Sequence, residues 1–191
     1  MATAATYPAT FEVDYPERLS RWLIFVKWLL VIPHWIILYA FQYLIQATTF
    51  IAWFAILFTG RYPKALFDLA VIYWRWYSRT IAYLALMRDE YPPFGGGTPE
   101  YPVRLDIQYP AKLSRLLIFV KWLLAIPHYL VLALLGLVGL AVYVLAWFAI
   151  LFTGRFPKGM FDFLVGVGRW YVRVNAYVML MRDEYPPFSL S

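Results

Sequence analysis

The chain has 191 residues, of which 63% are hydrophobic and 15% charged, and its formal net charge is +6. Soluble domains are about half apolar and about a quarter charged, so this chain has more apolar side chains than one core can bury. It contains no cysteine, which excludes disulfides, thiolate zinc sites and thiolate iron–sulfur clusters. The composition predicts an all-α integral membrane protein whose positive charge meets anionic lipid headgroups rather than nucleic acid.

The sequence contains an internal repeat. Residues 7–94 align with residues 101–188 without a gap, and 50 of the 88 aligned pairs are identical. The repeat predicts two tandem pseudo-symmetric units, namely repeat 1 at 1–94 and repeat 2 at 101–191, joined by a glycine-rich linker at 95–100. Residues 1–10 lack the pattern of a cleavable signal peptide, so insertion is expected to depend on later segments.

Each repeat is expected to begin with a short surface β-strand. At 9–15 and at 103–109 apolar residues alternate with polar ones, and prolines bound each run. This alternation is typical of a half-buried strand, and one strand from each repeat can pair with the other. Because a two-stranded hairpin is marginal in water, we expect the pair to pack on amphipathic helices.

A long apolar run follows each strand. Neither 28–60 nor 122–154 contains Asp, Glu, Lys or Arg. Each full run exceeds the roughly 20 residues that one membrane span needs, so we predict a transmembrane helical hairpin in each repeat with its turn near 40–46 or the equivalent. The spans are expected at about 19–40 and 43–60 in repeat 1, and at about 113–134 and 137–154 in repeat 2.

The hairpins would place every basic residue on one side of the membrane. The positive-inside rule then puts both termini of a multi-pass protein in the cytoplasm. The alternative is a surface helix at 17–32, a break at Pro33 and a single span at 34–58.

The repeats are expected to end in interfacial amphipathic helices at about 65–88 and 159–182. Three charged residues of each helix form a narrow stripe at 100° per residue, and aromatic residues crowd the remainder. Two central arginines make insertion costly, so each helix is expected to lie in the interface. These arginines are candidate lipid-headgroup or anion contacts, or else part of a solvated stripe with an internal Asp–Arg pair; they are Arg75, Arg79, Arg169 and Arg173.

The apolar runs and the stripes together suggest an intramembrane polar cluster. In each repeat a lysine precedes a histidine by seven residues, which places both on one helix face. Such a cluster would bind an anion or relay protons. Alternatively, the lysine extends to the membrane surface and the histidine bonds a carbonyl freed near Pro33. The candidate members are Lys27, His34, Asp68, Lys121, His128 and Asp162.

His34 and His128 are the chain's two histidines, and the repeat relates them. At equal depth they would ligate a haem iron from both sides, although a structural role is the alternative and no Cys-x-x-Cys-His motif occurs. No other cofactor or metal is expected. The Asp-Glu pairs at 89–90 and 183–184 are interpreted as solvated loop charges. Because no Walker loop, Gly-x-Ser-x-Gly or His-Glu-x-x-His motif is present, the chain is not predicted to be an enzyme.

Several long motifs occur in both repeats. They are Tyr-Pro-x-x-Leu-Ser-Arg, Val-Lys-Trp-Leu-Leu-x-Ile-Pro-His, Trp-Phe-Ala-Ile-Leu-Phe-Thr-Gly-Arg-x-Pro and Asp-Glu-Tyr-Pro-Pro-Phe. Over nearly its whole length the chain resembles the bacterial membrane family known as domain of unknown function 4389. The resemblance implies a bacterial inner-membrane protein and supplies no catalytic residues.

The predicted function is a non-catalytic membrane scaffold or an accessory subunit of a bacterial inner-membrane complex. Its expected partners are membrane lipids and either other membrane subunits or a second copy of the chain. One alternative is a small transporter or lipid-handling protein that uses the polar cluster. Another is a haem-binding electron-transfer protein that uses His34 and His128.

Overall fold

The computed structural model describes residues 7–97 and 100–191. Residues 1–6 and 98–99 lie outside the described residues. They include most of the segment for which no signal peptide is predicted and part of the predicted linker. Repeat 1 contains β1 (Ala9–Val13), α1 (Leu23–Leu30), α2 (Ile32–Thr59) and α3 (Lys64–Leu84). Repeat 2 contains β2 (Val103–Ile107), the 3-10 helix η1 (Leu117–Phe119), α4 (Lys121–Leu124), α5 (Ile126–Thr153) and α6 (Lys158–Val178).

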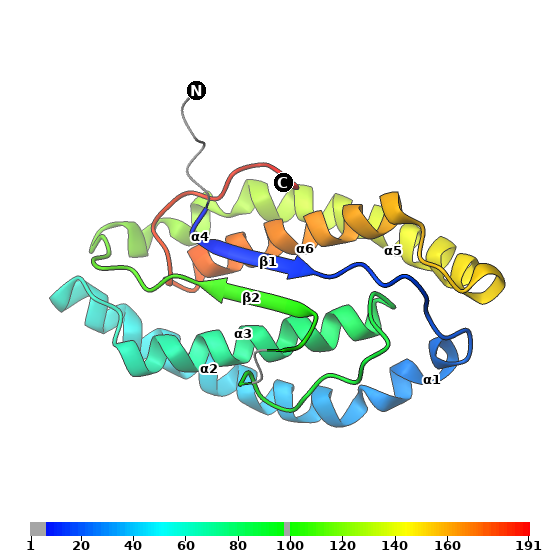
Figure 1. The fold of residues 1–191 in the computed structure, drawn as a ribbon. Coiled ribbons are helices and arrows are strands. Elements are labelled where there is room, and N and C mark those ends of the chain that lie inside the picture. The colour runs from blue at the N-terminus through cyan, green and yellow to red at the C-terminus, as the bar shows by residue number, and fades with distance from the viewer. Residues whose placement is uncertain (1–6, 98–99) are drawn as a thin grey trace.

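The elements form three layers, and the two repeats contribute equivalent elements to each layer (Figure 1). β1 pairs with β2 in an antiparallel sheet in which Phe11 lies opposite Leu105, so the predicted strands and their pairing are present. α6 packs on β1 and α3 packs on β2, while α2 packs on α3 and α5 packs on α6. The sheet is therefore the first layer, α3 and α6 are the second, and the long apolar helices are the third.

The predicted transmembrane hairpins are wrong. α2 and α5 are each one continuous helix of 28 residues, and at 1.5 Å per residue such a helix extends about 42 Å. Residues 40–49 contain no Gly, Pro, Asn or Asp, so nothing in this stretch favours a turn. The observed helix boundaries are closer to the alternative prediction of one helix at 17–32 and a second at 34–58, because the short helix α1 precedes Pro33 and the long helix α2 contains the residues that follow it.

Each long helix ends at a glycine. Gly60 and Gly154 have φ of 71° and 69°, a left-handed conformation that glycine adopts without the cost of a Cβ atom. A proline three residues later precedes the next helix, α3 or α6. The two glycines thus turn the chain from the third layer back into the second.

The helices α3 and α6 match most of the predicted ranges 65–88 and 159–182, but they do not lie on the outside. Their aromatic side chains are buried between the sheet and the long helices, as Trp74, Trp76 and Trp170 show. The sequence pattern of a polar stripe with aromatic flanks arises here because the stripe faces the sheet and the aromatic residues fill the core.

One face of α2 is buried and the opposite face is exposed. The buried positions include His34, Leu38, Ile45, Ala52 and Ile56, a spacing of three, four or seven residues that repeats on one side of a helix. By length and composition alone, the segments Leu23–Thr59 and Lys121–Thr153 are apolar enough to cross a membrane, and only 28% and 11% of their most apolar stretches are buried. Core helices of soluble proteins are mostly buried, so these two differ from them.

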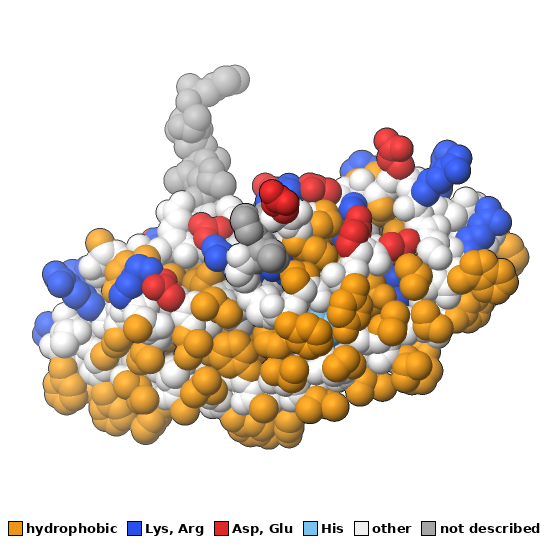
Figure 2. Space-filling model, turned by 60° about the horizontal axis from the view of Figure 1, so that its bottom comes forward, with side chains coloured by type: hydrophobic (Ala, Val, Ile, Leu, Met, Phe, Trp, Pro, Cys, Tyr) orange, Lys and Arg blue, Asp and Glu red, His pale blue; other side chains and the backbone are white. Residues whose placement is uncertain are grey.

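We use the term apolar face for the exposed aromatic and aliphatic side chains of α1, α2, η1, α4 and α5, with Trp22 and Leu116 just before them. Figure 2 shows this face as a nearly continuous apolar surface, with the acidic and basic side chains gathered along the opposite margin. Its most exposed members are Trp22 at 82% and Leu116 at 78%. An apolar surface of this extent indicates an interaction site or a membrane contact rather than a surface in water.

Candidate functional site

The most deeply buried charges form the same ion pair in each repeat. Lys27 Nζ lies 2.8 Å from Asp89 Oδ1 and donates a hydrogen bond of 2.6 Å to the carbonyl of Arg88. Burial lowers the pKa of Lys27, while the hydrogen bond and the charge of Asp89 act in the opposite direction. Lys121 and Asp183 form the second copy at 2.7 Å. Each pair connects the start of a long helical segment to the end of its own repeat.

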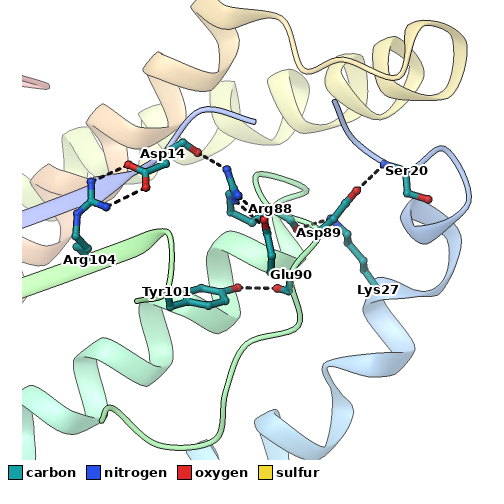
Figure 3. A network of polar contacts seen from close by, with 8 residues as sticks. All are labelled: Asp14, Ser20, Lys27, Arg88, Asp89, Glu90, Tyr101 and Arg104. Carbon is teal, nitrogen blue, oxygen red and sulfur yellow. Dashed lines mark hydrogen bonds and ion pairs between the residues drawn. The ribbon is translucent and has the colours of Figure 1, made fainter. Parts of the chain in front are cut away.

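The same aspartate also holds the chain before α1 (Figure 3). Asp89 Oδ2 accepts a hydrogen bond of 2.5 Å from the backbone N–H of Ser20, and Asp183 accepts the equivalent bond from Ser114. The interpretation of the Asp-Glu pairs as solvated loop charges is therefore wrong. The lysine that binds each aspartate lies 62 residues earlier, and a spacing of this length gives no signal of contact in the sequence.

A second branch of this network reaches the sheet. Arg88 forms an ion pair with Glu90 and donates a hydrogen bond of 2.9 Å to the carbonyl of Asp14. The carboxylate of Asp14 in turn accepts two hydrogen bonds, of 2.7 and 2.9 Å, from Arg104 on β2. These bonds hold the pKa of Asp14 below its usual value. Tyr101 completes the branch by donating its hydroxyl proton to the carbonyl of Glu90 at 2.7 Å.

Each histidine is fully buried and enclosed by aromatic side chains of its own repeat. Trp76 Nε1 donates a hydrogen bond of 2.8 Å to His34 Nδ1, and the Phe94 ring stacks on the imidazole with centroids 4.2 Å apart. Because Nδ1 accepts this bond, the neutral ring carries its proton on Nε2. Burial lowers the pKa of His34, which agrees with a neutral imidazole.

His128 has the same surroundings. Trp170 Nε1 donates to its Nδ1 at 3.0 Å, and Phe188 stacks on it with centroids 4.0 Å apart. In both repeats the phenylalanine ends the Asp-Glu-Tyr-Pro-Pro-Phe motif. The aspartate at the start of this motif therefore contacts the lysine of the short helix. The phenylalanine at its end contacts the histidine of the long helix.

The structure does not assemble the predicted intramembrane polar cluster. Asp68 is exposed in the first turns of α3 and pairs with Lys64, whereas Lys27 contacts residues that follow the other end of α3. The 16 residues from Asp68 to Leu84 alone extend about 24 Å along the helix. Asp162 is likewise exposed and pairs with Lys158, far along α6 from Lys121. The expected extension of Lys27 to the surface and the bond from His34 to a carbonyl are also wrong.

The four stripe arginines are directed to the sheet and the C-terminal tail. Arg75 Nε donates to the carbonyl of Leu105 at 2.9 Å, and Arg169 Nε donates to the carbonyl of Phe11 at 3.0 Å. These bonds satisfy backbone acceptors of the two strands. Arg79 lies over the ring of Tyr101, and Arg173 lies over the ring of Tyr7 and donates to the carbonyl of Ser191. Their observed contacts are within the chain.

Within residues 7–97 and 100–191, no group of three or more His, Asp or Glu side chains is placed to hold a metal ion. The buried polar groups described above join one segment of the chain to another. The surface feature that they do not account for is the apolar face, to which the long helices α2 and α5 contribute along the length of the molecule.

Comparison with known proteins gives one match. The family model described as Domain of unknown function (DUF4389) matches residues 21–95 and again residues 115–189. No curated protein and no solved structure matches. Each matched region begins before the first helix of its repeat and ends just after the phenylalanine that stacks on the histidine, so the family unit coincides with one ion pair and one histidine enclosure. The chain belongs to this family and contains two tandem copies of its domain.

Proposed function

We propose that this protein is a non-catalytic scaffold that lies on a membrane, with α2 and α5 parallel to the bilayer plane and the apolar face in one leaflet. The observation that carries the proposal is the separation of surfaces: the long helices expose aromatic and aliphatic side chains, and the charged residues lie on the opposite side (Figure 2). A helical layer that is apolar on one side and polar on the other is stable at a membrane interface.

The position of the sheet argues against a spanning arrangement. Arg75, near the middle of α3, bonds to β2, and α3 packs along α2, so the sheet lies beside the long helices. If α2 crossed the bilayer, the exposed charges of Glu12, Arg104 and Asp106 would enter the hydrocarbon. Each charge at that depth costs about 3 kcal/mol. An in-plane position keeps all of them in water.

The scaffold role is supported by the structural use of the buried polar side chains. The Lys27–Asp89 pair and the Trp76–His34 bond each connect segments of one repeat, which supports a structural use of the buried chemistry. The outer surface of the sheet then faces the aqueous phase and is available to other subunits or to a second copy of the chain. This proposal keeps lipids and membrane proteins as the partners and replaces the multi-pass topology.

Single cysteines test the in-plane arrangement, since the chain has none of its own. Glu17→Cys and Ala111→Cys lie at opposite ends of the long helices. In spheroplasts and in inverted vesicles, a membrane-impermeant maleimide should label both variants from the same side. Gln46→Cys, exposed near the middle of α2, should be protected in both preparations. Labelling of the two end positions from opposite sides would reject the proposal.

The scaffold role has a separate test. Purification of the full chain in mild detergent should recover a stoichiometric partner or a defined homo-oligomer. An isolated monomer under conditions that preserve other membrane complexes would contradict it.

A further inference from the structure

Six exposed basic residues form two clusters at opposite ends of the molecule. We name them the first triad (Arg18, Arg21 and Arg155) and the second triad (Lys112, Arg115 and Arg61). Each triad takes two residues from the loop before the first helix of one repeat and one residue from the end of the long helix of the other. The repeat relates the two triads position by position.

The backbone brings each triad together. Leu19 donates its N–H to the carbonyl of Gly154 at 2.9 Å, which places Arg18 and Arg21 around the end of α5. Together with Thr153 and Arg155, these residues line one hollow on the surface. At the other end Leu113 donates to the carbonyl of Gly60 at 2.8 Å, and the side chains of Lys112 and Arg115 lie beside this glycine.

The six cations differ from most other basic residues in their contacts. Among the residues that the structure describes, none of the six forms an ion pair, whereas eight others do and Arg169 and Arg173 donate hydrogen bonds to carbonyls. The eight are Lys27, Lys64, Arg75, Arg88, Arg104, Lys121, Lys158 and Arg182. One cation beside the last carbonyls of a helix is favourable because of the helix dipole. Three cations at one helix end concentrate positive charge there, and such a concentration favours the binding of an anion.

The neighbours of the triads indicate which anion fits. Trp22 follows Arg21 directly, and Phe152 precedes the end of α5; these side chains are 82% and 71% exposed. In the second triad the equivalent neighbours are Leu116 and Phe58. Each triad therefore borders the apolar face at its charged margin, so that one ligand can place an anionic group among the cations and its apolar part against the exposed rings.

We propose that each triad binds the phosphate of an anionic phospholipid whose acyl chains lie against the apolar face. Guanidinium groups recognise phosphate through paired, charge-assisted hydrogen bonds. This inference rests on the proposed in-plane membrane position. It assigns the headgroup contacts to the two triads instead of to the arginines of α3 and α6.

The two sites are not equivalent, because Glu17 precedes the first triad and the corresponding residue of repeat 2 is Ala111. The second triad thus has no carboxylate at this position and should bind more tightly. Glu17→Ala should strengthen binding at the first triad, and Ala111→Glu should weaken binding at the second. A gain of affinity in Glu17→Ala cannot result from misfolding.

The test titrates the purified full chain with phosphatidylglycerol in detergent and counts bound lipids by native mass spectrometry. Two tight sites are expected for the wild type, one for R18Q/R21Q/R155Q and one for K112Q/R115Q/R61Q. Each cation is expected to contribute about fivefold to the affinity. The affinity of a site that has lost its three cations should therefore fall roughly a hundredfold. The matched control K64Q/R104Q/K158Q removes the same charge from exposed, ion-paired residues and should keep both sites. Equal losses in the control and in either triad variant would overturn the proposal.

Further arms separate the alternatives. Flotation with vesicles of phosphatidylcholine alone tests the apolar face: wild type and all variants should float, and failure of the wild type would reject the in-plane proposal itself. Competition by millimolar inorganic phosphate would identify a free-anion site and overturn the lipid assignment. If a triple variant does not fold, the single substitutions R18Q and K112Q replace it, and an unchanged affinity in both would also overturn the proposal.

Discussion

Leu19 of repeat 1 and Gly154 of repeat 2 are joined by a backbone hydrogen bond of 2.9 Å, and Leu113 and Gly60 are joined in the same way at 2.8 Å. The last carbonyls of a helix have no partner within the helix. Here the loop that leads into one long helix satisfies a carbonyl at the end of the other. The two repeats therefore complete each other's helices.

Substitution of the glycines at these junctions should lower stability by a modest amount. Gly154→Ala and Gly60→Ala place a Cβ atom on a residue with φ near 70°, which costs about 1 kcal/mol. The new Cβ at 154 would lie 3.5 Å from Arg21 Nε, an ordinary contact, so strain in the backbone should dominate. Denaturation in detergent measures the change. Gly159→Ala, in open space within α6, is the control and should lose nothing.

The two members of the buried ion pair should differ in their cost on replacement. Lys27 is 1% exposed and Asp89 is 25% exposed. Asp89→Asn leaves a cation in the core and should cost about 3 kcal/mol, whereas after Lys27→Met water still reaches part of the carboxylate and the loss should be smaller. Unfolding free energies of both variants check this order. The exposed Lys64→Met should stay within about 0.5 kcal/mol, and a reversed order would contradict the burial argument.

Stability should fall as the pH is lowered through the range in which free histidine titrates. Burial lowers the pKa of His34 and of His128 in the folded chain, while in the unfolded chain each has a pKa of about 6.5. Above that pH both states are neutral. Below it the unfolded chain takes up protons that the folded chain excludes, so each histidine reduces stability by up to about 1.4 kcal/mol per pH unit. Unfolding measured between about pH 7.5 and 5.5 tests this, and His34→Gln should reduce the slope.

Two glycines of repeat 2 should respond in opposite ways to alanine. A Cβ atom at Gly168 would lie 2.7 Å from the Phe11 ring, whereas Gly136 has no neighbour within 4 Å. Gly168→Ala should therefore cost about 1–3 kcal/mol through overpacking, and Gly136→Ala should be neutral or slightly stabilising. Phe11→Leu should restore stability in the Gly168→Ala background, because the equivalent positions hold a larger residue on the helix and a leucine on the strand, namely Trp74 of repeat 1 and Leu105 of repeat 2. A failure of this rescue would show that the ring is not the obstacle.

The strands and the repeat could be predicted because both can be recognised in the sequence without knowledge of the packing. Alternation at 9–15 needs only neighbouring residues, and the identity of the two halves needs only an offset. The lack of charge in α2 does not decide how this helix is placed, since hydropathy alone does not distinguish a helix that crosses a membrane from one that lies in a leaflet. In repeat 1 the absence of turn residues at 40–49 is a local signal against a hairpin, whereas the equivalent stretch of repeat 2 contains Gly136 and Gly139 and gives no such signal.

The contacts of the candidate site residues could not be predicted for a different reason. Lys27 and His34 lie in two successive helices, α1 and α2, and each contacts a residue more than 40 positions away, namely Asp89 and Trp76. Seven-residue spacing reports the face of a helix and carries no information about what packs on it. The assembly of the basic residues near Gly60 and Gly154 into clusters depends on the contact between the two repeats, and the sequence of either repeat alone does not indicate it.

The exchange of hydrogen bonds between Leu19 and Gly154 and between Leu113 and Gly60 has a consequence for the history and handling of this chain. A single repeat has no partner for its strand and none for the end of its long helix, yet it retains its own ion pair and its own enclosed histidine. The duplicated chain is thus equivalent to a twofold dimer whose subunits have been fused through a short linker. Two halves expressed as separate chains should find each other, and a chain with one copy of the domain would have to dimerise to complete the same structure.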